Sequence, residues 1–324
     1  MLSPSDTPPQ RRWPLRIALA TTLLALVVTG TVLSTPKSHA DANSPTSSTA
    51  VTTSIPPPST TSTTAPPKTT LPAALNQRSR GCGFAMASQS GVASGSNGAV
   101  ATRAIGHCTI LEIGDSIGSD LGWGLERELA STHTLKLAMM DKSSSGLAAT
   151  WFYDWPRQLK SMIAHFHPNL VVVAVGADDE QGIRVDGHSY DFNTPGWRAR
   201  YTTLIRQMDT TATKAGSYVL WVGLPIMAPA GYRAGVVAIN SLFHSVAATV
   251  PGVTYLSTWS LFADSHGRFR YGASVNHTLS AIRSPDGIHF TVVGEDVFAT
   301  FVAQSIAATY HVRIKLDRPA FLTG

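Results

Sequence analysis

The sequence has few cysteines and few charges. It contains 324 residues, of which only Cys82 and Cys108 are cysteines and 14% are charged. No Cys and His residues have the spacing of a structural metal site, so we predict no metal and no cofactor. The net charge of +5 is modest, and no lysine and arginine cluster is interleaved with aromatic residues. The sequence therefore argues against a nucleic-acid partner.

The first 40 residues predict export from the cytoplasm. Three arginines precede an uncharged, mostly apolar run at 17–33, an order that places the amino terminus in the cytoplasm. This run is short for a membrane span and long for the core of a signal peptide. Two alternatives stay open, a retained single membrane anchor or a signal peptide cleaved near Ala40. In both cases the remaining chain is expected to be extracytoplasmic.

Residues 41–75 are dominated by Ser, Thr and Pro and contain almost no large apolar side chains. Such a segment cannot bury enough surface to offset the entropy lost on ordering, so we predict a disordered, partly polyproline linker. Its length either holds the following domain away from the membrane or has no function. The domain itself is expected at 76–324. In an exported domain the even cysteine count predicts one disulfide, Cys82 to Cys108.

From residue 109 onward, short apolar runs alternate with longer amphipathic stretches. We expect strands at 109–113, 135–140, 170–175, 218–222 and 253–256. Helices are expected to follow at 117–129, 155–165, 197–215, 236–250 and 292–310. This alternation predicts an α/β domain with three layers, α/β/α, around a mainly parallel sheet.

Ser116 lies where an apolar, β-branched run is broken by Gly114 and Asp115 and a four-residue apolar repeat begins. This change of period predicts a turn from strand to helix. A serine there exposes its hydroxyl, and the N–H groups at the helix start face any negative charge that develops. The same residues are also ordinary turn chemistry, so this signal is weak by itself.

A Pro/Gly loop near the other end carries Asp286 and His289, three residues apart. A serine hydroxyl becomes a good nucleophile when a histidine takes its proton, and a carboxylate fixes the histidine tautomer. Either residue alone has an ordinary structural explanation in a turn. Together with Ser116 they fit the order Ser, Asp, His of a serine hydrolase.

Two further blocks lie between these ends. Ser145-Gly146-Leu147 is followed by Tyr153-Asp154-Trp155-Pro156, and the other block is Gly176-Ala177-Asp178-Asp179. In such a sheet ligands bind beyond the carboxyl ends of the strands. Ser116, Gly146 and Asp178 each follow a predicted strand, so the topology predicts that they converge.

With Gly114-Asp115-Ser116 and Asp286-Gly287-Ile288-His289, these blocks resemble the SGNH (GDSL-like) hydrolase superfamily. Within it, the chain is similar to a DUF459-like group of bacterial cell envelopes, over about residues 105–310. The resemblance implies a flavodoxin-like fold in which Ser116 is the nucleophile, His289 the base and Asp286 its orienting acid. It also implies an oxyanion hole formed by Ser116, Gly146 and the residue at position 178.

Position 178 departs from the family pattern, which has an asparagine where this chain has Asp178. An ionised carboxylate repels a negative intermediate, and the loss of one oxyanion donor costs about 10²–10³-fold in rate. Three alternatives stay open. Asp178 is protonated beside Asp179 and donates as a neutral acid; the N–H groups of Ser116 and Gly146 suffice for a slow enzyme; or the domain binds without catalysis.

Other residues near these blocks are candidates for substrate binding, each with a structural alternative. Asp179 and Gln181 are expected to line the pocket. Arg283 is expected either to meet a carboxylate of the substrate or to be a solvated loop residue. Trp155 is a candidate wall for stacking a sugar ring. Four of the seven tryptophans are assigned to the core by default, namely Trp151, Trp155, Trp197 and Trp221.

The resemblance and the predicted compartment imply an extracytoplasmic serine esterase or acyltransferase. The expected substrate is a small acyl ester, such as acetyl, on a cell-envelope glycan. The alternative is a weakened or inactive domain of the same fold that binds glycan or acts as an envelope scaffold. A lipid esterase lacks support because no apolar lid segment is recognisable.

Overall fold

The computed structural model describes residue 75 and residues 107–323. The predicted membrane or signal segment, the linker up to residue 74 and Cys82 lie outside these residues, so the segment, the linker and the disulfide stay predictions. Within the described part, no helix combines the length and the apolar character needed to cross a bilayer.

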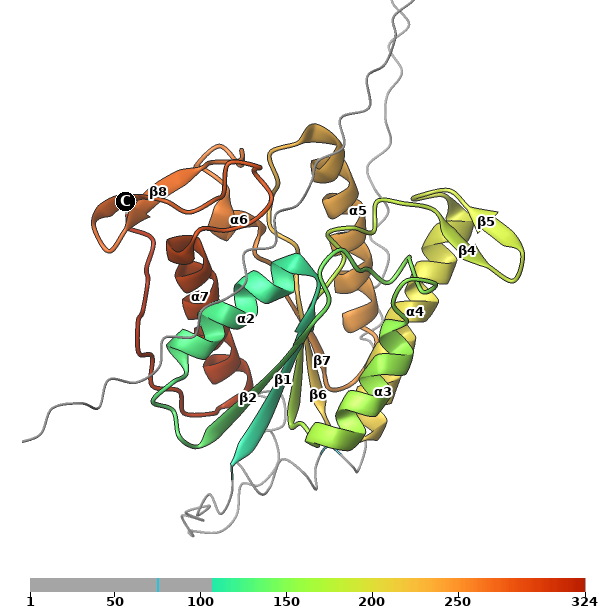
Figure 1. Ribbon diagram of the computed structural model, residues 1–324, viewed down its shortest axis with the longest axis horizontal. Coiled ribbons are helices and arrows are strands. Elements are labelled where there is room, and N and C mark those ends of the chain that lie inside the picture. Colours follow the sequence, from blue (N-terminus) through green and yellow to red (C-terminus); the bar gives the residue numbers. More distant parts are fainter. Residues whose placement is uncertain (1–74, 76–106, 324) are drawn as a thin grey trace, which may run out of the picture. The chain divides into compact units, whose positions relative to one another are not determined.

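A five-stranded parallel sheet forms the centre of the domain (Figure 1). Its strands are β1 (Cys108–Gly114), β2 (Leu135–Asp141), β3 (Leu170–Ala174), β6 (Tyr218–Val222) and β7 (Val253–Leu256). They lie in the order β2-β1-β3-β6-β7, which is the flavodoxin-like order. All four pairings between neighbouring strands are parallel.

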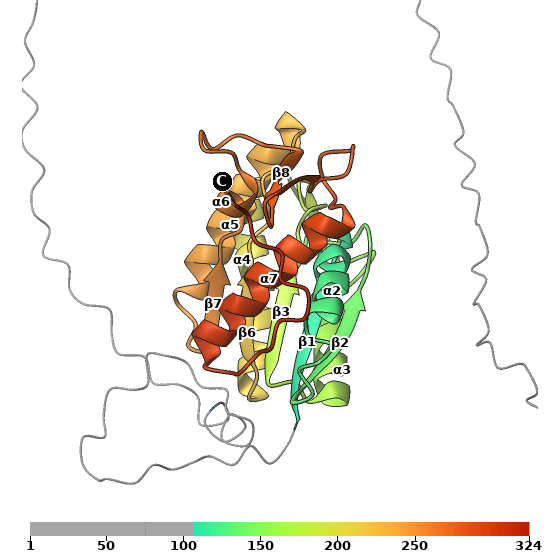
Figure 2. The same ribbon diagram turned by 90° about the vertical axis from the view of Figure 1, so that its left-hand side faces the viewer.

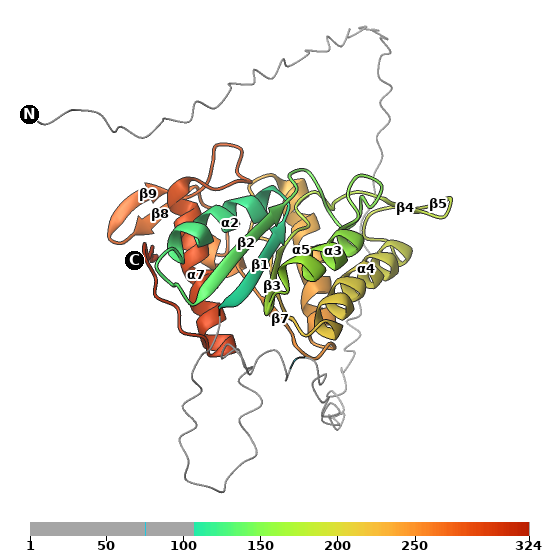
Figure 3. The same cartoon turned by 60° about the horizontal axis from the view of Figure 1, so that its bottom comes forward.

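Helices cover both faces of the sheet. On one face α2 (Ser116–Glu128) packs against α7 (Val292–Tyr310), as Figure 2 shows. The other face carries α3 (Trp155–Phe166), α4 (Pro195–Lys214) and α5 (Ala230–Ala247), which lie together in Figure 3. The predicted three-layer α/β/α architecture with a parallel sheet is confirmed.

The hydrophobic pattern explains which strands lie at the centre. Every residue of β3 and β6 is buried, whereas β2, at the edge of the sheet, is only partly buried. Strands that are covered by helices on both faces lose the alternation of apolar and polar residues. Aromatic stacking joins β6 to the helix layer, because the rings of Trp221 and Phe243 lie 4.5 Å apart.

Several short elements are not among the sequence predictions. Two hairpins, β4 (Ile183–Val185) with β5 (His188–Tyr190) and β8 (Gly272–Val275) with β9 (Thr278–Ala281), project from the sheet, and α6 is the single turn Trp259–Phe262. Elements of three or four residues are too short to show a period. The first hairpin nevertheless has a local signal in the sequence, the pair Asp186-Gly187. Both residues have positive φ, as a two-residue hairpin turn requires.

The strand order places a crevice at the carboxyl ends of β1 and β3. From β1 the chain first crosses to β2 on one side and then returns to β3 on the other. Loops leave such a switch point in opposite directions, and ligands bind between them in open α/β sheets. Ser116 follows β1 and Gly176 follows β3, so both lie at this point.

Candidate active site

Ser116 is the first residue of α2, directly beyond the end of β1. The turn is possible because residue 114 is glycine: a Cβ there would lie 2.4 Å from the carbonyl oxygen of Ala174 and 2.5 Å from the Cα of Gly118. Asp115 caps the helix, since its Oδ1 accepts from the N–H of Ile117 at 2.9 Å. The N–H of Ser116 precedes the hydrogen-bond ladder of the helix and is open to a ligand.

Three side chains from distant parts of the sequence form one hydrogen-bonded chain. The Oγ of Ser116 lies 2.8 Å from Nε2 of His289, across 173 positions. Nδ1 of the same ring lies 2.7 Å from Oδ2 of Asp286. A histidine that donates from Nδ1 leaves Nε2 free to accept the serine proton. The geometry is that of a nucleophile, a base and an acid that orients the base.

Asp286 is held in the charged form. Its burial is slight, and hydrogen bonds from the His289 ring and from the N–H groups of Ile288 and His289 outweigh it and lower the pKa of Asp286 to about 2. The two N–H groups donate to Oδ1 at 2.8 Å and 3.0 Å. Oδ2 is therefore left to the imidazole, and a permanent negative charge faces it across the useful pH range.

A buried aspartate links the first block to the third. Oδ2 of Asp115 accepts from the N–H groups of Gly176 and Ala177 at 2.7 Å and 2.8 Å. Burial raises the pKa of Asp115 to about 7, although these hydrogen bonds lower it. The residue before the serine thus fixes the loop that carries Asp178. Sequence reasoning treated Asp115 as a turn residue and missed this role.

A second buried aspartate links the third block to the second. Asp179 accepts from the N–H groups of Leu147 and Ala148 at 2.9 Å and 2.8 Å and from the hydroxyl of Tyr201 at 2.7 Å. Burial raises the pKa of Asp179 to about 6 against these hydrogen bonds. Its side chain is fully buried, so the predicted contact with substrate is wrong. Its carboxylate holds the Gly146 loop instead.

Gly146 packs directly on this carboxylate. A Cβ at Gly146 would lie 2.0 Å from Oδ1 of Asp179, so only glycine allows the loop to approach so closely. Among the described residues, no hydrogen bond uses the N–H of Gly146. Asp178, next along the third block, is half-buried. Burial raises its pKa, and the nearby charge of His289 opposes this.

Two other candidates for substrate binding are also placed differently. Trp155 is fully buried, and its Nε1 donates to Oγ of Ser145 at 3.0 Å. It supports the Gly146 loop from the buried side, and neither face of its ring is accessible to a sugar. Gln181 is partly buried and donates from Nε2 to the carbonyl of Asp178 at 2.6 Å, which engages its amide in the loop itself.

Arg283 is neither a substrate contact nor a solvated loop residue, because it is only 2% exposed. It donates to the carbonyl groups of Ile226 at 2.9 Å and His289 at 3.3 Å, and also to that of Ile288. Its guanidinium lies 4.2 Å from the ring centroid of Phe290. Burial lowers the pKa of Arg283 to about 10. The residue braces the loop that presents the imidazole.

Asp120, one helical turn after Ser116, is a further residue that sequence reasoning missed. Its Oδ2 accepts from the N–H of Phe290 at 3.0 Å, which connects the serine helix to the histidine loop. Burial raises the pKa of Asp120 to about 6, while that hydrogen bond lowers it. The signal available in the sequence was a charged residue directly before Leu121, which lies on the apolar face of the helix.

Glu112 lies in the middle of β1 and is fully buried. It neither faces an edge nor pairs with an arginine, because its neighbour is the carboxyl group of Asp141, at the end of β2. Burial, followed by the charge of Asp141, raises the pKa of Glu112 well above its ordinary value. A Cβ on Gly118 would lie 2.9 Å from the carbonyl oxygen of Ala174 and 3.2 Å from both carboxyl groups, so a glycine lets the helix lie close to β3 and to this pair.

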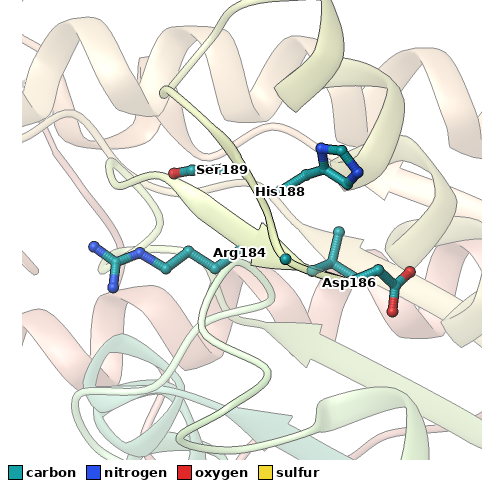
Figure 4. Close-up of a pocket in the computed structure, with 6 residues that line it drawn as sticks. Arg184, Asp186, His188 and Ser189 are labelled. Atoms are coloured by element: carbon teal, nitrogen blue, oxygen red, sulfur yellow. The ribbon is translucent and has the colours of Figure 1, made fainter.

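A surface pocket at the β4–β5 hairpin contains none of the predicted site residues. Figure 4 shows that Arg184 and Ser189 point to one side of it and Asp186 and His188 to the other. These groups do not converge on a point where a reacting atom could lie. Among the described residues, no three His, Cys, Asp or Glu side chains are grouped to hold a metal ion.

Several solved structures have a similar fold. One is TesA, with 18% identity, a TM-score of 0.43, and coverage of 62% of this chain and 99% of that one. Another is the psychrotrophic esterase EstA from Pseudoalteromonas sp., with 14% identity, a TM-score of 0.42, and coverage of 62% and 97%. A third is a catalytic mutant of Axe2, an acetylxylan esterase from Geobacillus stearothermophilus, with 15% identity, a TM-score of 0.43, and coverage of 65% and 99%.

The family comparison covers more than half of the chain. No curated protein matches the sequence. The model of the family described as "Protein of unknown function (DUF459)" matches residues 109–305. This range begins in β1 and ends in α7, so it holds the whole sheet and all four sequence blocks. The chain therefore belongs to the DUF459 family, as its resemblance to the DUF459-like group predicted.

Proposed function

We propose that this protein is an SGNH-type serine esterase or acyltransferase that works outside the cytoplasm on small acyl esters of cell-envelope carbohydrate. The observation that carries the proposal is the chain of hydrogen bonds from Ser116 through His289 to Asp286. A serine hydroxyl within 2.8 Å of an oriented imidazole has what nucleophilic acyl transfer requires.

In the proposed reaction the Oγ of Ser116 attacks the acyl carbonyl carbon while Nε2 of His289 takes the hydroxyl proton. The carbonyl oxygen becomes an oxyanion facing the N–H groups of Ser116 and Gly146. The tetrahedral intermediate collapses when His289 gives the proton to the leaving alkoxide, which departs as an alcohol and leaves an acyl-serine. Water or a sugar hydroxyl then attacks the acyl-serine, with His289 again acting as base.

The proposed compartment rests on the sequence, and the proposed substrate class rests on the family resemblance and on that compartment. The basic and apolar amino-terminal residues, followed by a Ser, Thr and Pro-rich segment, are typical of a domain held outside the membrane. The proposed ester carrier is an acylated glycan of the cell envelope.

Labelling of the full chain with a fluorophosphonate tests the nucleophile. We expect the wild-type protein to be labelled and Ser116→Ala to be unlabelled. Acetate release from purified wall polysaccharide then tests the substrate. A folded wild-type protein that neither takes the label nor releases acetate would exclude the enzyme.

One observation favours a second candidate function, a glycan-binding domain without turnover. Asp178 stands where the family pattern has the asparagine that donates to the oxyanion, and a carboxylate does not donate. Polysaccharide binding by an unlabelled wild-type protein, unchanged in Ser116→Ala, would support this candidate.

A further inference from the structure

Two aromatic side chains next to the Gly146 loop are exposed to solvent. Trp151 is 74% exposed and Phe152 is 43% exposed, although both belong to residue types that normally contribute large buried areas. Their ring centroids are 6.0 Å apart and their planes are inclined by 60°. The prediction that placed Trp151 in the core is wrong, and the exposure of the pair needs an explanation.

The pair is presented by a rigid turn. The N–H groups of Phe152 and Tyr153 both donate to the carbonyl of Ala149, at 2.9 Å and 3.1 Å. On the far side of the turn, Tyr153 packs edge-on against the buried Trp155, with centroids 4.8 Å apart. The aromatic pair therefore stands on an ordered base, which reduces the entropy lost when a ligand binds.

The same segment connects the aromatic pair to Gly146, the proposed oxyanion donor. Asp179 fixes Leu147 and Ala148 by two hydrogen bonds, one and two residues after Gly146. Only two residues, Ala149 and Thr150, separate this clamp from Trp151. A ligand stacked on the exposed rings therefore contacts the same loop that carries the proposed oxyanion donor.

A positive charge borders the aromatic pair. The Nζ of Lys142 lies 5.3 Å from the ring centroid of Phe152. The backbone of Lys142 is tied to the active-site end of the sheet, because its N–H donates to the carbonyl of Gly114 at 2.8 Å. The neighbouring Ser143 and Ser144 are exposed. The segment from Lys142 to Phe152 thus combines two apolar ring faces with several hydrogen-bond donors.

We infer that Trp151 and Phe152, with Lys142, form a carbohydrate subsite that binds a pyranose ring of the acyl-bearing polymer beside the scissile ester. The C–H groups on one face of a pyranose make an apolar surface that stacks on an aromatic ring, and its oxygens accept from an ammonium group. Two exposed side chains are too few for a stable protein interface, which buries about 800 Å² on each partner. This inference rests on the proposed function.

The test compares two substrates in variants of the full chain. For Trp151→Ala we expect kcat/KM for acetate release from O-acetylated wall polysaccharide to fall at least tenfold, mainly through KM. Hydrolysis of 4-nitrophenyl acetate, which has no sugar, is expected to change less than twofold. Trp151→Tyr should recover most of the loss. The control is Trp123→Ala, because Trp123 on α2 is also about half exposed (49%) and lies outside this segment.

The outcomes separate the subsite from the proposed chemistry. An equal loss on both substrates, or none on the polysaccharide, overturns the subsite and leaves the esterase intact. If the wild type hydrolyses neither ester, the esterase fails. The subsite is then judged by binding of alkali-deacetylated polysaccharide to the wild type and to Trp151→Ala. Loss of a dimer or of liposome binding in Trp151→Ala, with polysaccharide binding unchanged, also overturns it.

Discussion

The rate and the pH dependence of the proposed reaction depend on Asp178. Its carboxyl group is half-buried near the imidazole of His289, and burial raises its pKa while the imidazolium charge opposes this. A neutral acid donates to an oxyanion, whereas an ionised one repels it. Activity should therefore decline as the pH rises through the pKa of Asp178.

We predict that Asp178→Asn raises turnover of 4-nitrophenyl acetate at pH 8 by about 10- to 100-fold, because an amide donates at every pH. The alkaline decline of the wild-type protein should disappear in this variant. The pH profile of kcat measures both effects. Glu180→Gln is the matched control, since Glu180 is the exposed acid two positions further on. An unchanged rate and profile in Asp178→Asn would refute an oxyanion role for this position.

Loops at the ends of strands carry the proposed function at the scale of structural elements. The loop between β2 and α3 has a glycine, Gly146, against Asp179, and the loop before α7 encloses the guanidinium of Arg283. The Gly146 loop is fixed by a buried carboxyl group from a distant part of the sequence, and the histidine loop by its own buried arginine. Disturbing that group should move the reacting atoms without altering them chemically.

Gly146→Ala should lower kcat by about 10²–10³-fold, the cost of one lost oxyanion donor. The added methyl group would lie 2.0 Å from Oδ1 of Asp179, so either the loop or the carboxylate must shift. Gly231→Ala is the control, because a Cβ at this position in the first turn of α5 meets no atom within 4 Å. Equal kinetics of the two variants would contradict the proposed position of the donor.

Arg283→Met is expected to reduce both stability and kcat. The change removes the donor to the carbonyl groups of Ile226 and Ile288, at about 1–3 kcal/mol for each buried acceptor left unpaired, and frees His289 from its brace. Chemical denaturation and the split between kcat and KM measure the two effects. Arg268→Met provides the comparison, because Arg268 is 71% exposed in an ion pair with Asp264 and such pairs contribute at most about 1 kcal/mol. A loss confined to KM would argue against a positioning role.

Buried carboxyl groups determine how the stability of the whole domain depends on pH. Burial raises the pKa to about 7 for Asp115 and Asp209 and to about 6 for Asp120, Asp141 and Asp179. In the unfolded chain such groups titrate near pH 3.9. The folded state therefore binds more protons between about pH 4 and pH 7, and its stability must fall as the pH rises through this range.

We predict that the domain melts at a temperature roughly 5 °C or more higher at pH 5 than at pH 8. Asp209→Asn should reduce this difference, because an amide does not titrate. The variant should still fold, because the amide oxygen can accept from Nε1 of Trp221, as Oδ1 of Asp209 does at 2.7 Å. Calorimetry at both pH values measures the effect. A melting temperature that rises from pH 5 to pH 8 would show that the buried carboxyl groups are not the dominant titrating groups.

The sequence by itself determined the order along the chain of the five central strands and the five long helices, the parallel sheet and the three side chains that meet at its carboxyl edge. The signals for these features are local: apolar runs, a change of period at Ser116, and an Asp and a His three residues apart. The edge at which strand-end residues meet then follows from the topology of parallel sheets.

Only the tertiary structure decided which side chains are buried. Trp151 and Trp155 are the same residue type four positions apart, yet one is 74% exposed and the other fully buried. Asp179 and Arg283 had the appearance of substrate contacts and are framework groups, because each has a hydrogen-bond partner far along the chain, Ala148 at 31 positions and Ile226 at 57. Burial and distant hydrogen bonds depend on how separate elements pack together, and no local pattern of residues encodes that.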